Sequence, residues 1–587
     1  MAEGGTALGA QGAQARHPRF FSWASLLLIT PLCVLGSVVG MQVLVRLGVT
    51  TNTALIGALA AMGLGRVPLG FLRRYRDIHV QNLAQSAISA STFGAANSLL
   101  LPIGIPFLLG RPDLVPAMLA GAVAAMLLDA TMLYRMFDSE VFPARGAWPP
   151  GVAAAEAIRA GDEGGRKAVV LGVGLGIGVA GSLCGIPMSG FGVAFIGNAW
   201  ALGVFGAGLL LRGYEHALLD HPAFAWLLPG GDIDGGHVAQ GMMLGAGLVA
   251  LGQVVATILR RPAKAGAAGG EGRDAARPGR VGQDRPGQDR PGQDRVGPDA
   301  VGAAGESPGR LSGGEGAGPT PAQLRATLGL GAGVYLAIAA GIAALGGLAG
   351  GMSTSMLVLF VAYAAFAALL HELIIGLAGM HSGWFPAFAV AVVSLAVGIL
   401  IGFPAPALAL LVGFTASTGP AFADMGCDLK AGFLLRGQGE DPEYERDGRR
   451  QQYYAAMFAL VVAALTVLVL YPGYFARGEV APADRVFVAA IRAGSSPAVA
   501  HALALWAIPG GVLQALGGSR RQIGIMFATG LLLVSPLAGW AVAAGITCRL
   551  AWERWAGEAG RGDMEVFAAG SIAGDALTSF AGSVIRA

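Results

Sequence analysis

The chain has 587 residues and a formal net charge of +3, with 54% hydrophobic and only 13% charged residues. Soluble domains carry about 25% charged residues, so this composition excludes a water-soluble globular protein. So small a net charge gives no reason to expect a nucleic-acid partner, and the composition favours membrane lipids as the surroundings of the chain.

Runs of apolar residues long enough to cross a membrane recur along almost the whole chain. About 20 apolar residues span the hydrocarbon core as an α-helix, whereas a membrane barrel shows short alternating segments. We therefore predict an all-α polytopic membrane protein with about 14–16 transmembrane helices. Two runs are expected to break at internal prolines, which are Pro102 and Pro106 in one and Pro404 and Pro406 in the other. The predicted spans are 21–46, 51–66, 83–109, 114–134, 168–184, 187–211, 238–259, 323–350, 354–380, 385–417, 452–475, 484–510, 521–547 and 564–585.

Positive charges gather in a few short segments between the predicted spans. Cytoplasmic loops of membrane proteins carry an excess of Lys and Arg, so we expect these segments and the N-terminus to face the cytoplasm. The first apolar run is too long for the core of a signal peptide and is predicted to be a retained helix. The basic clusters are Arg16 and Arg19; Arg66, Arg73, Arg74 and Arg76; Arg260, Arg261 and Lys264; and Arg436, Arg449 and Arg450.

Residues 260–321 interrupt the apolar pattern. They are rich in Gly, Pro, Ala, Arg and Asp, and they include the repetitive tract VGQDRPGQDRPGQDRVGPD. Such a segment cannot bury a core, so we predict a disordered cytoplasmic linker between two membrane halves. Two-fold internal repeats are common in secondary transporters, and we expect the halves to be pseudo-repeats. The predicted organisation is a cytoplasmic tail 1–20, a first half 21–259, the linker 260–321 and a second half 322–587.

Known catalytic and nucleotide-binding motifs are incomplete or missing in the sequence. HELIIGLAGMH begins like a zinc-protease motif, but Ile375 stands where the second histidine ligand is required. The chain has no phosphate-binding loop of the pattern G-x-x-x-x-G-K-S/T, and its four cysteines form no C-x-x-C pair. We therefore predict that the protein is not an enzyme and has no cofactor and no metal site.

A polar stripe opens the span that follows the first basic loop. In HVQNLAQSAISAST the spacing of Asn82, Gln85, Ser86 and Ser89 places these four side chains on one helix face. Amides and hydroxyls both donate and accept hydrogen bonds, which suits a zwitterionic or peptide-like solute. The alternative is that this face packs on another helix through interhelical hydrogen bonds.

A fifth candidate for solute binding is Glu156, which lies in the segment WPPGVAAAEAIRAGDEGGRKA. The segment starts with a Pro-Pro-Gly turn and is too short and too polar to span a bilayer. It is predicted to be a half-helix that enters the membrane from the cytoplasmic side. The alternative is an amphipathic helix on the surface.

Charged residues inside apolar runs are candidates for proton coupling, because a charge inside a bilayer costs about 2.5–3.5 kcal/mol on insertion scales. His371 and Glu372 interrupt the run AYAAFAALLHELIIGLAGM, and Asp575 lies near the centre of the last span. His titrates near neutral pH, and a buried Glu holds a proton more tightly than an exposed one. The alternatives are a helix end in interfacial water for the first two and a structural hydrogen bond for Asp575.

Three further charged residues form a candidate gate in GPAFADMGCDLKAGFLLRG. Asp424 and Asp428 are four residues apart and are expected to share a helix face, where Lys430 could pair with either carboxylate. The alternative is an ion pair in a cytoplasmic loop, worth under about 1 kcal/mol.

Four segments, taken in chain order, resemble the motifs of the oligopeptide transporter (OPT) family, in particular its bacterial branch related to yellow-stripe-like carriers. HVQNLAQSAISA is similar to the motif E-N-x-x-Q-T-x-A-S-A, and WPPGVAAAEAIRAGDEGG to P-x-G-x-A-x-A-E. DMGCDLKAGFLLRG is similar to Q-D-L-K-T-G-Y-L-x-G, with Cys427 and Ala431 in place of Gln and Thr, and FAAGSIAGDALTSFAG to a terminal A-A-G-L-I-A-G-E, with Asp575 in place of Glu. The matching residues in the first three segments are Asn82, Gln85, Ala87, Ser89 and Ala90; Pro150, Gly151, Ala153, Ala155 and Glu156; and Asp428, Leu429, Lys430, Gly432, Leu434 and Gly437.

This resemblance implies a helical carrier in the cell (inner) membrane that imports short oligopeptides or peptide-like metal chelates together with protons. Its partners would be membrane lipids, the solute and protons, and the sequence predicts no oligomeric state. Two alternatives stay open at this point, a membrane scaffold or receptor without transport and a lipid-modifying membrane enzyme.

Overall fold

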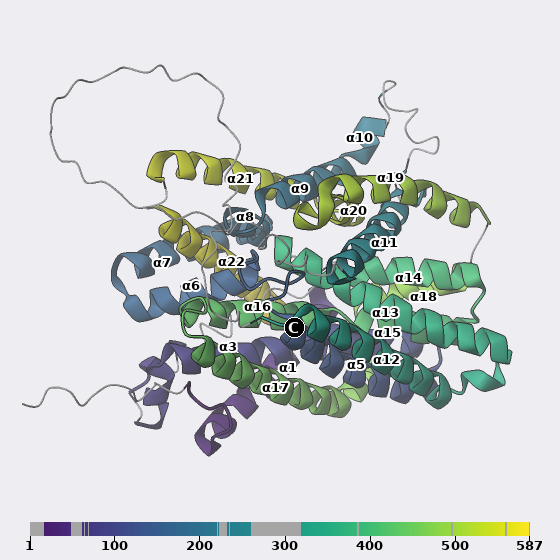
Figure 1. Ribbon diagram of the computed structural model, residues 1–587, viewed down its shortest axis with the longest axis horizontal. Helices are drawn as coiled ribbons and strands as arrows, with labels where there is room; N and C mark the ends of the chain where they lie inside the picture. The colour runs from purple at the N-terminus through teal and green to yellow at the C-terminus, as the bar shows by residue number, and fades with distance from the viewer. Residues whose placement is uncertain are drawn as a thin grey trace, which may run out of the picture. The chain divides into compact units, whose positions relative to one another are not determined.

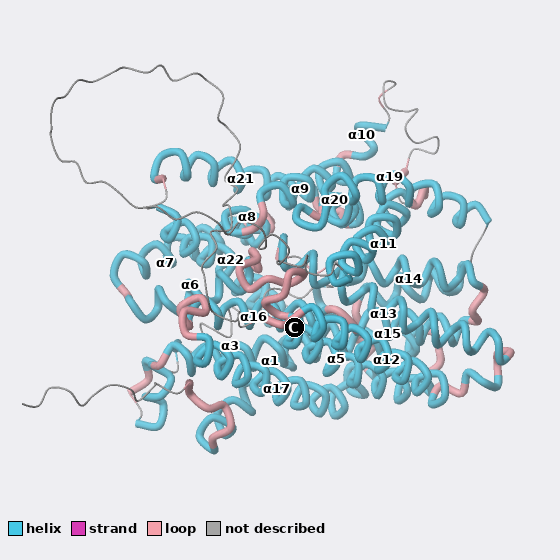
Figure 2. Tube along the Cα trace, in the orientation of Figure 1, coloured by secondary structure: helices cyan, strands magenta, loops and turns pink. Residues whose placement is uncertain are grey.

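The apolar runs fold almost entirely into helices, which Figure 2 shows by colour. The computed structural model describes residues 17–47, 62–63, 65–68, 70–219, 221, 232–233, 235–259, 318–383, 385, 387–494, 497–557 and 560–585. Most of the predicted tail 1–20, of the predicted span 51–66 and of the predicted linker 260–321 lies outside these residues. In the described part of the chain, the only strand-like feature is the isolated pairing of Phe137 with Phe142. The predicted all-α fold class is confirmed.

The helices before the linker begin and end close to the predicted apolar runs. They are α1 (Trp23–Leu47), the 3-10 helix η1 (Gly70–Arg76), α3 (Ile78–Phe93), the π-helix η2 (Gly94–Leu100), α4 (Leu101–Leu108), the 3-10 turn η3 (Pro112–Leu114), α5 (Val115–Met136), α6 (Pro149–Glu163), α7 (Gly165–Leu183), α8 (Met188–Ile196), α9 (Ala199–Gly213), α10 (Glu215–Leu219) and α11 (Val238–Leu259).

The helices after the linker include the two longest of the described chain, α13 and α17. They are α12 (Pro321–Leu345), the 3-10 turn η4 (Leu348–Gly350), α13 (Thr354–Ser382), α14 (Ala387–Ile401), α15 (Ala405–Ser417), α16 (Pro420–Leu435), α17 (Pro442–Ala476), α18 (Pro482–Ala493), α19 (Pro497–Arg521), α20 (Ile523–Leu532), α21 (Pro536–Ala556) and α22 (Arg561–Ile585).

Eight helical stretches of the described chain are long and apolar enough to cross a membrane. They support the predicted polytopic membrane protein. Further apolar helices are shorter, at Ala199–Gly213, Val238–Ala250, Val390–Ile401 and Ile523–Leu532. The eight candidate spans are Ser25–Val45, Ile78–Leu108, Pro112–Met136, Gly165–Leu183, Pro321–Leu345, Thr354–Ser382, Ala405–Leu435 and Pro442–Ala476.

Three predicted spans are each divided between two helices. The run 187–211 is divided because Asn198 accepts hydrogen bonds from two backbone N–H groups and so caps the start of α9. The run 484–510 is divided after α18, where Gly494 has a φ of 71° that ends the helix. The run 521–547 is divided at the extended residue after α20 and the proline that begins α21.

The predicted break in the run 83–109 is wrong. Pro102 lies in the first turn of α4 and Pro106 lies inside it, and the chain stays helical past both. The irregularity lies before them in η2, where the Leu101 N–H bonds to a carbonyl five residues back. A proline has no N–H to donate, and a widened turn accommodates the missing bond. The other predicted break is confirmed, since Gly402 (φ 92°) separates α14 from α15.

Helices from the two sides of the linker pack against one another (Figure 1). The described residues on both sides belong to one compact unit. α16 lies among α3, α5 and α6 from the first side and α13 and α17 from the second. Any site on α16 is therefore built from both sides of the linker.

Small residues allow some of these helices to touch backbone to backbone. A Cβ atom on Gly174 or Gly178 of α7 would lie 2.3 and 2.2 Å from carbonyl oxygens of α22. A Cβ on Gly570 or Gly574 of α22 would meet carbonyl oxygens of α7 at 2.3 Å. These glycines form a small-residue interface of the kind that holds membrane helices together.

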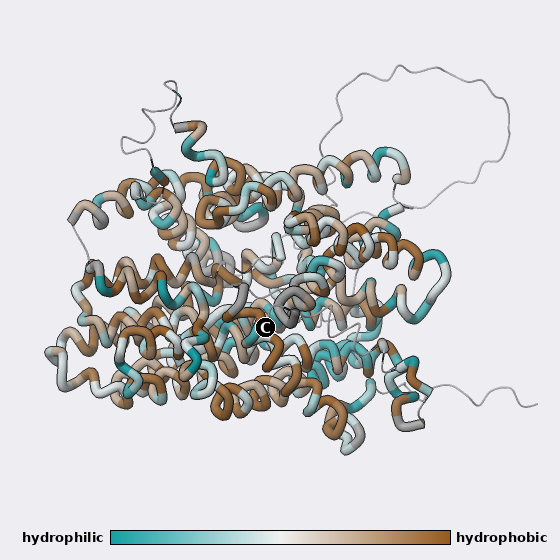
Figure 3. Tube along the Cα trace, turned by 180° about the vertical axis from the view of Figure 1, so that it is seen from behind, coloured by the Kyte–Doolittle hydropathy of each residue, from teal (hydrophilic) through white to brown (hydrophobic). Residues whose placement is uncertain are grey.

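The outer faces of the long helices are apolar. Figure 3 shows brown, hydrophobic residues along most helices. On α17, Leu465 and Val469 are 58% and 74% exposed, and Leu468 between them is 51% exposed. Large apolar side chains on an outward face suit contact with lipid rather than water.

Candidate functional site

The candidate site is built on α16, which follows a backbone position that favours glycine. Gly419 has a φ of 92°, in the region that side chains rarely adopt, and Pro420 begins the helix. Every residue of α16 except Leu434 is buried. Polar residues on so buried a helix require partners from the helices around it.

Asp424 and Asp428 find such partners on α3. The Ser89 hydroxyl donates to Oδ1 of Asp424 at 2.6 Å, and Nε2 of Gln85 donates to Oδ1 of Asp428 at 2.6 Å. Both carboxylates are at most 3% exposed. The predicted polar face of α3 and the predicted acidic face of α16 therefore lie against each other.

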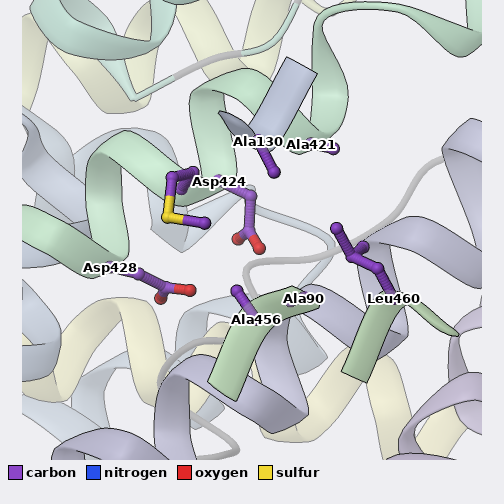
Figure 4. Close-up of a pocket in the computed structure, with 8 residues that line it drawn as sticks. Ala90, Ala130, Ala421, Asp424, Asp428, Ala456 and Leu460 are labelled. Atoms are coloured by element: carbon purple, nitrogen blue, oxygen red, sulfur yellow. The ribbon is translucent and has the colours of Figure 1, made fainter. Parts of the chain in front are cut away.

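A small pocket opens between these two acids and an otherwise apolar wall. Figure 4 shows both carboxylates at the pocket. The space between its lining side chains is about 180 Å³ in all, and no part of it is wide enough to hold a water molecule. In this conformation the pocket is therefore too narrow to admit a peptide. It is lined by Ala90, Ala130, Ala421, Asp424, Met425, Asp428, Ala456 and Leu460.

Several buried polar atoms of α3 and α16 have no hydrogen-bond partner in the described chain. They are both side-chain atoms of Asn82, Oε1 of Gln85 and Oδ2 of Asp428. Buried polar groups in proteins are nearly always paired with protein, water or ligand. Water or a ligand can therefore pair with these groups.

A polar network continues from α3 and α16 to α17. Nε2 of Gln452 donates to the Ser86 hydroxyl at 3.1 Å and to the Asp428 carbonyl at 2.6 Å. Its Oε1 accepts from Arg436 at 2.7 Å, and Arg436 makes two hydrogen bonds to Glu445. Ser86 is thus held by the network and does not line the pocket.

The same network includes two residues of one predicted basic cluster. Arg436 and Glu445 have fully buried side chains, and Arg449 also bonds to Glu445 and lies 3.1 Å from Asp138. Only Arg450 of this cluster has a mostly exposed side chain, at 56%. Arg436 and Arg449 are neutralised by acids inside the protein, so they are poor reporters of which side of the membrane the segment faces.

Among the described residues, Lys430 forms no ion pair with an acid. Its ammonium group donates to the Ala144 carbonyl at 2.9 Å and lies 5.7 Å from the Phe433 ring centroid. Two residues after Asp428 along a helix, the side chain points to a different face. The expected pairing of Lys430 with Asp424 or Asp428 is therefore absent.

Glu156 lies on α6 and pairs with Arg159 of the same helix at 2.7 Å. Arg159 also donates to the Leu434 carbonyl, near the end of α16. α6 is buried along most of its length and packs on α16 and α22. The alternative of an amphipathic surface helix is therefore wrong, and Glu156 belongs to the contact between α6 and α16 rather than to the pocket.

His371 and Glu372 are fully buried on α13, so neither reaches interfacial water. One oxygen of Glu372 lies 3.0 Å from the Tyr335 hydroxyl of α12, which donates at 2.5 Å to Asp129 of α5. The second oxygen of Asp129 accepts from the Gly419 N–H at 2.6 Å. This acid pair joins four helices, and its Asp129 is the residue next to Ala130 of the pocket wall.

The sequence analysis missed Asp129 and Tyr335. Asp129 carries the same signal as Asp575, an acid inside an apolar run, and the same argument would have found it. Tyrosines in apolar helices are common and give no such signal.

Asp575 lies elsewhere, on α22. It accepts hydrogen bonds from the Ser189 N–H at 2.8 Å and the Ser189 hydroxyl at 2.5 Å, in the first turn of α8. This is the arrangement of a capping acid at a helix N-terminus. The structural alternative is favoured for this residue.

The described residues contain no group of three or more His, Cys, Asp or Glu side chains that could hold a metal ion. The acids of α16 instead suit hydrogen-bond donors and ammonium groups, which carboxylates bind in buried sites.

The profile of the OPT oligopeptide transporter protein family matches residues 21–218 and 238–586. The chain belongs to the OPT family. The match covers every candidate residue of the site, from Asn82 to Asp575. A comparison with curated proteins gave no match. OPT proteins are membrane transporters and not enzymes, so the prediction of a non-enzyme is confirmed and a lipid-modifying enzyme is no longer an alternative.

Proposed function

We propose that this OPT protein is a secondary active importer of short oligopeptides or peptide-like metal chelates, driven by protons. It would act in the cell (inner) membrane as a member of the bacterial branch related to yellow-stripe-like carriers. The four shorter apolar helices, together with α19, α21 and α22, would bring the crossings to about 14–16, with the N-terminus and the linker on the cytoplasmic side. The observation that carries the proposal is the buried pocket with Asp424 and Asp428 in its wall.

The two acids supply the charge that a peptide-like solute needs. A peptide carries an ammonium group and a row of amide N–H donors, and both donate hydrogen bonds to carboxylates. Gln85, which bonds to Asp428, and Asn82 on the same helix hold buried acceptors and a donor without partners. These groups suit the carbonyl and N–H groups of a peptide backbone. Ser89 would release Asp424 when a solute donates in its place.

A metal chelate would bind through its organic ligand. The described chain has no cluster that would take the metal from its chelator. Carboxyl, amine and hydroxyl groups of such a ligand need the same hydrogen-bond partners as a peptide, which is why both solute classes stay in the proposal.

The closed pocket implies that transport requires a rearrangement around α16. Helices from both sides of the linker surround it, and movement of the two halves against each other would open the pocket alternately. Lys430 fastens α16 to the segment between α5 and α6 through Ala144, and Glu156 holds α6 near the end of α16 through Arg159. We assign these two residues to gating rather than to solute contact.

The test is uptake by the purified full-length protein in proteoliposomes. Labelled di- to hexapeptides and ferric chelates are offered separately, with and without an inward proton gradient. Gradient-driven accumulation of one class supports the proposal and identifies that class as the substrate. Failure to take up either class, with protein that remains monodisperse, would overturn the proposal and favour a scaffold or receptor.

Matched variants separate the pocket from the rest of the molecule. Asp424→Asn and Asp428→Asn should abolish uptake because each removes a carboxyl group from the pocket wall. Asp113→Asn changes an acid that is exposed and pairs with Arg111 in a turn, so uptake should be unchanged. Equal uptake by all three variants would contradict a role for the pocket.

A further inference from the structure

The Tyr335 hydroxyl has one hydrogen and two carboxyl neighbours. Its oxygen lies 2.5 Å from Oδ1 of Asp129 and 3.0 Å from Oε2 of Glu372. An ionised carboxylate only accepts hydrogen bonds, and a tyrosine hydroxyl donates once. If both acids were ionised, one of these contacts would bring two oxygens together with no hydrogen between them. One of the two acids therefore carries a proton.

The surroundings of Asp129 favour its ionised form. Its Oδ2 accepts from the Gly419 N–H at 2.6 Å, at the N-terminus of α16, where the helix dipole stabilises negative charge. The 2.5 Å contact with Tyr335 has the length of a hydroxyl that donates to a charged carboxylate, about 2.5–2.7 Å. Asp129 thus accepts two hydrogen bonds and lies at the N-terminus of a helix, and both features stabilise its negative charge.

Glu372 has none of these supports. Its Oε2 makes the longer contact with Tyr335, and its Oε1 has no hydrogen-bond partner in the described chain. The neighbouring His371 does not contact it and is held by the Ala387 carbonyl and the Thr418 hydroxyl. Within the described residues, no Lys, Arg or His forms an ion pair with Glu372 or Asp129. A neutral acid is the form of Glu372 that fits these contacts.

We propose that Glu372, Tyr335 and Asp129 form a proton-binding site, with the proton on Glu372 and the negative charge on Asp129. In this arrangement the Glu372 O–H donates to the Tyr335 oxygen, and the Tyr335 O–H donates to Asp129. The site itself follows from the geometry of the four helices, whereas its use in transport rests on the proposed function.

Release of the proton would act on the pocket through α16. When the O–H bond of Glu372 breaks, its electron pair stays on the carboxylate and the proton passes to water, which reaches this buried site only when the surrounding helices move apart. Tyr335 can then donate to only one of two like charges, so α13 is pushed from α5 and α12. Asp129 holds Gly419 at the start of the helix that carries Asp424 and Asp428, so the proton and the solute act on the same helix.

Infrared spectroscopy of the purified protein tests the proton without any transport. The carbonyl stretch of a protonated carboxyl group is separate from the carboxylate bands and shifts in D₂O. At neutral pH the difference spectrum between the unmodified protein and Glu372→Gln should show the loss of one protonated carboxyl. The spectrum for Asp129→Asn should show the loss of a carboxylate, as should the spectrum for the control Asp113→Asn, which leaves the site intact. If Glu372→Gln removes a carboxylate band instead, the assignment is overturned.

Transport assays test the coupling. Glu372→Gln and the milder Tyr335→Phe should lose accumulation against a solute gradient but keep counterflow exchange, in which no net proton moves. Gel filtration of each variant confirms that it is folded. Accumulation that survives intact in both variants overturns the role in coupling. If the unmodified protein exchanges no solute, the proposed function fails, and the infrared result still decides the proton site.

Discussion

Ser89 and Asp424 show how a single hydroxyl supports a buried charge. The Ser89→Ala variant removes the donor to Asp424, and a hydrogen bond to a charged group contributes about 1.5–3 kcal/mol. We expect the variant to lose about this much free energy of unfolding and therefore to have a lower thermal unfolding midpoint in detergent. Ser98 is the matched control, since its hydroxyl is buried on the neighbouring η2 without a partner. Ser98→Ala should not lower the midpoint, and an equal loss in both variants would contradict the role of the Ser89 bond.

Arg436 is a second residue whose removal leaves a buried charge. In Arg436→Met, Glu445 keeps only Arg449 as a cationic partner, and breaking a buried pair costs about 3–5 kcal/mol. Arg450 forms an exposed pair with Asp447 on the same helix, and Arg450→Met should change stability by less than about 0.5 kcal/mol. Chemical unfolding in detergent measures both variants. Similar effects would show that the buried network does not contribute to stability.

His17 makes the packing of the N-terminal segment depend on pH. Burial, together with the positive charge of Arg436, lowers the pKa of His17 from 6.5 to about 4. Its other titratable neighbours are His79, Tyr444 and Asp447. Because the folded pKa is below the unfolded one, the stabilisation is complete above about pH 6.5 and is lost as the pH falls toward 4.

Hydrogen exchange of the segment that contains Phe20, measured between pH 7 and pH 4 with correction for intrinsic rates, should therefore show increasing opening. Phe20 N–H bonds to Gln451, so its protection reports the docking of this segment. The variant His17→Phe keeps an aromatic ring but cannot titrate, and it should flatten the pH dependence. A dependence that is equally steep in this variant would point to another group.

The candidate site was partly predictable because its residues break local rules. Asn82, Gln85, Asp424 and Asp428 are polar residues on faces of apolar helices, and membrane insertion makes each of them costly without a partner. Which helix faces pack against each other is set by the tertiary fold, and it cannot be derived from the spacing of residues in the sequence. For this reason Lys430 was paired with the wrong group, and the partners of Asp129 were not found.

At the scale of elements, the position of a glycine on its helix decides whether a larger side chain can be accommodated there. Gly178 of α7 faces α22, where a Cβ would lie 2.2 Å from the Ser571 carbonyl, whereas a Cβ on Gly176 meets nothing within 4 Å. Gly178→Ala should destabilise the protein by about 1–3 kcal/mol because the two backbones must separate. Gly176→Ala should be neutral or stabilising, since alanine favours helix. Unfolding midpoints of the two variants give the comparison, and equal midpoints would rule out close packing at Gly178.

Helix boundaries were predictable where the chain marks them locally. Gly402 and the prolines after it separate α14 from α15 as expected. Pro102 and Pro106 did not end their helix, because a π-helical turn in a buried setting absorbs the missing hydrogen bond. Asn198 is a capping residue within an apolar run, and hydropathy alone passes over such a position.

At the scale of the whole molecule, the site depends on both sides of the linker. Residues 1–259 and 318–587 expressed as two chains should copurify when made together, because Gln85 and Ser89 of one chain bind Asp428 and Asp424 of the other. Either chain alone should aggregate or be degraded, since its buried polar groups lack partners. An affinity tag on one chain and gel filtration give the readout. A monodisperse product from either chain alone would contradict this dependence.

The distance along the chain between these partners also sets an order of events during synthesis. Gln85 and Asp428 are 343 residues apart, and at a translation rate of about 5–20 residues per second the first waits roughly 20–70 s for the second. During that time the polar face of α3 is already made while the acids that complete it are not. In the nascent protein, the pocket can therefore close only after α16 and α17, on the far side of the linker, have been made.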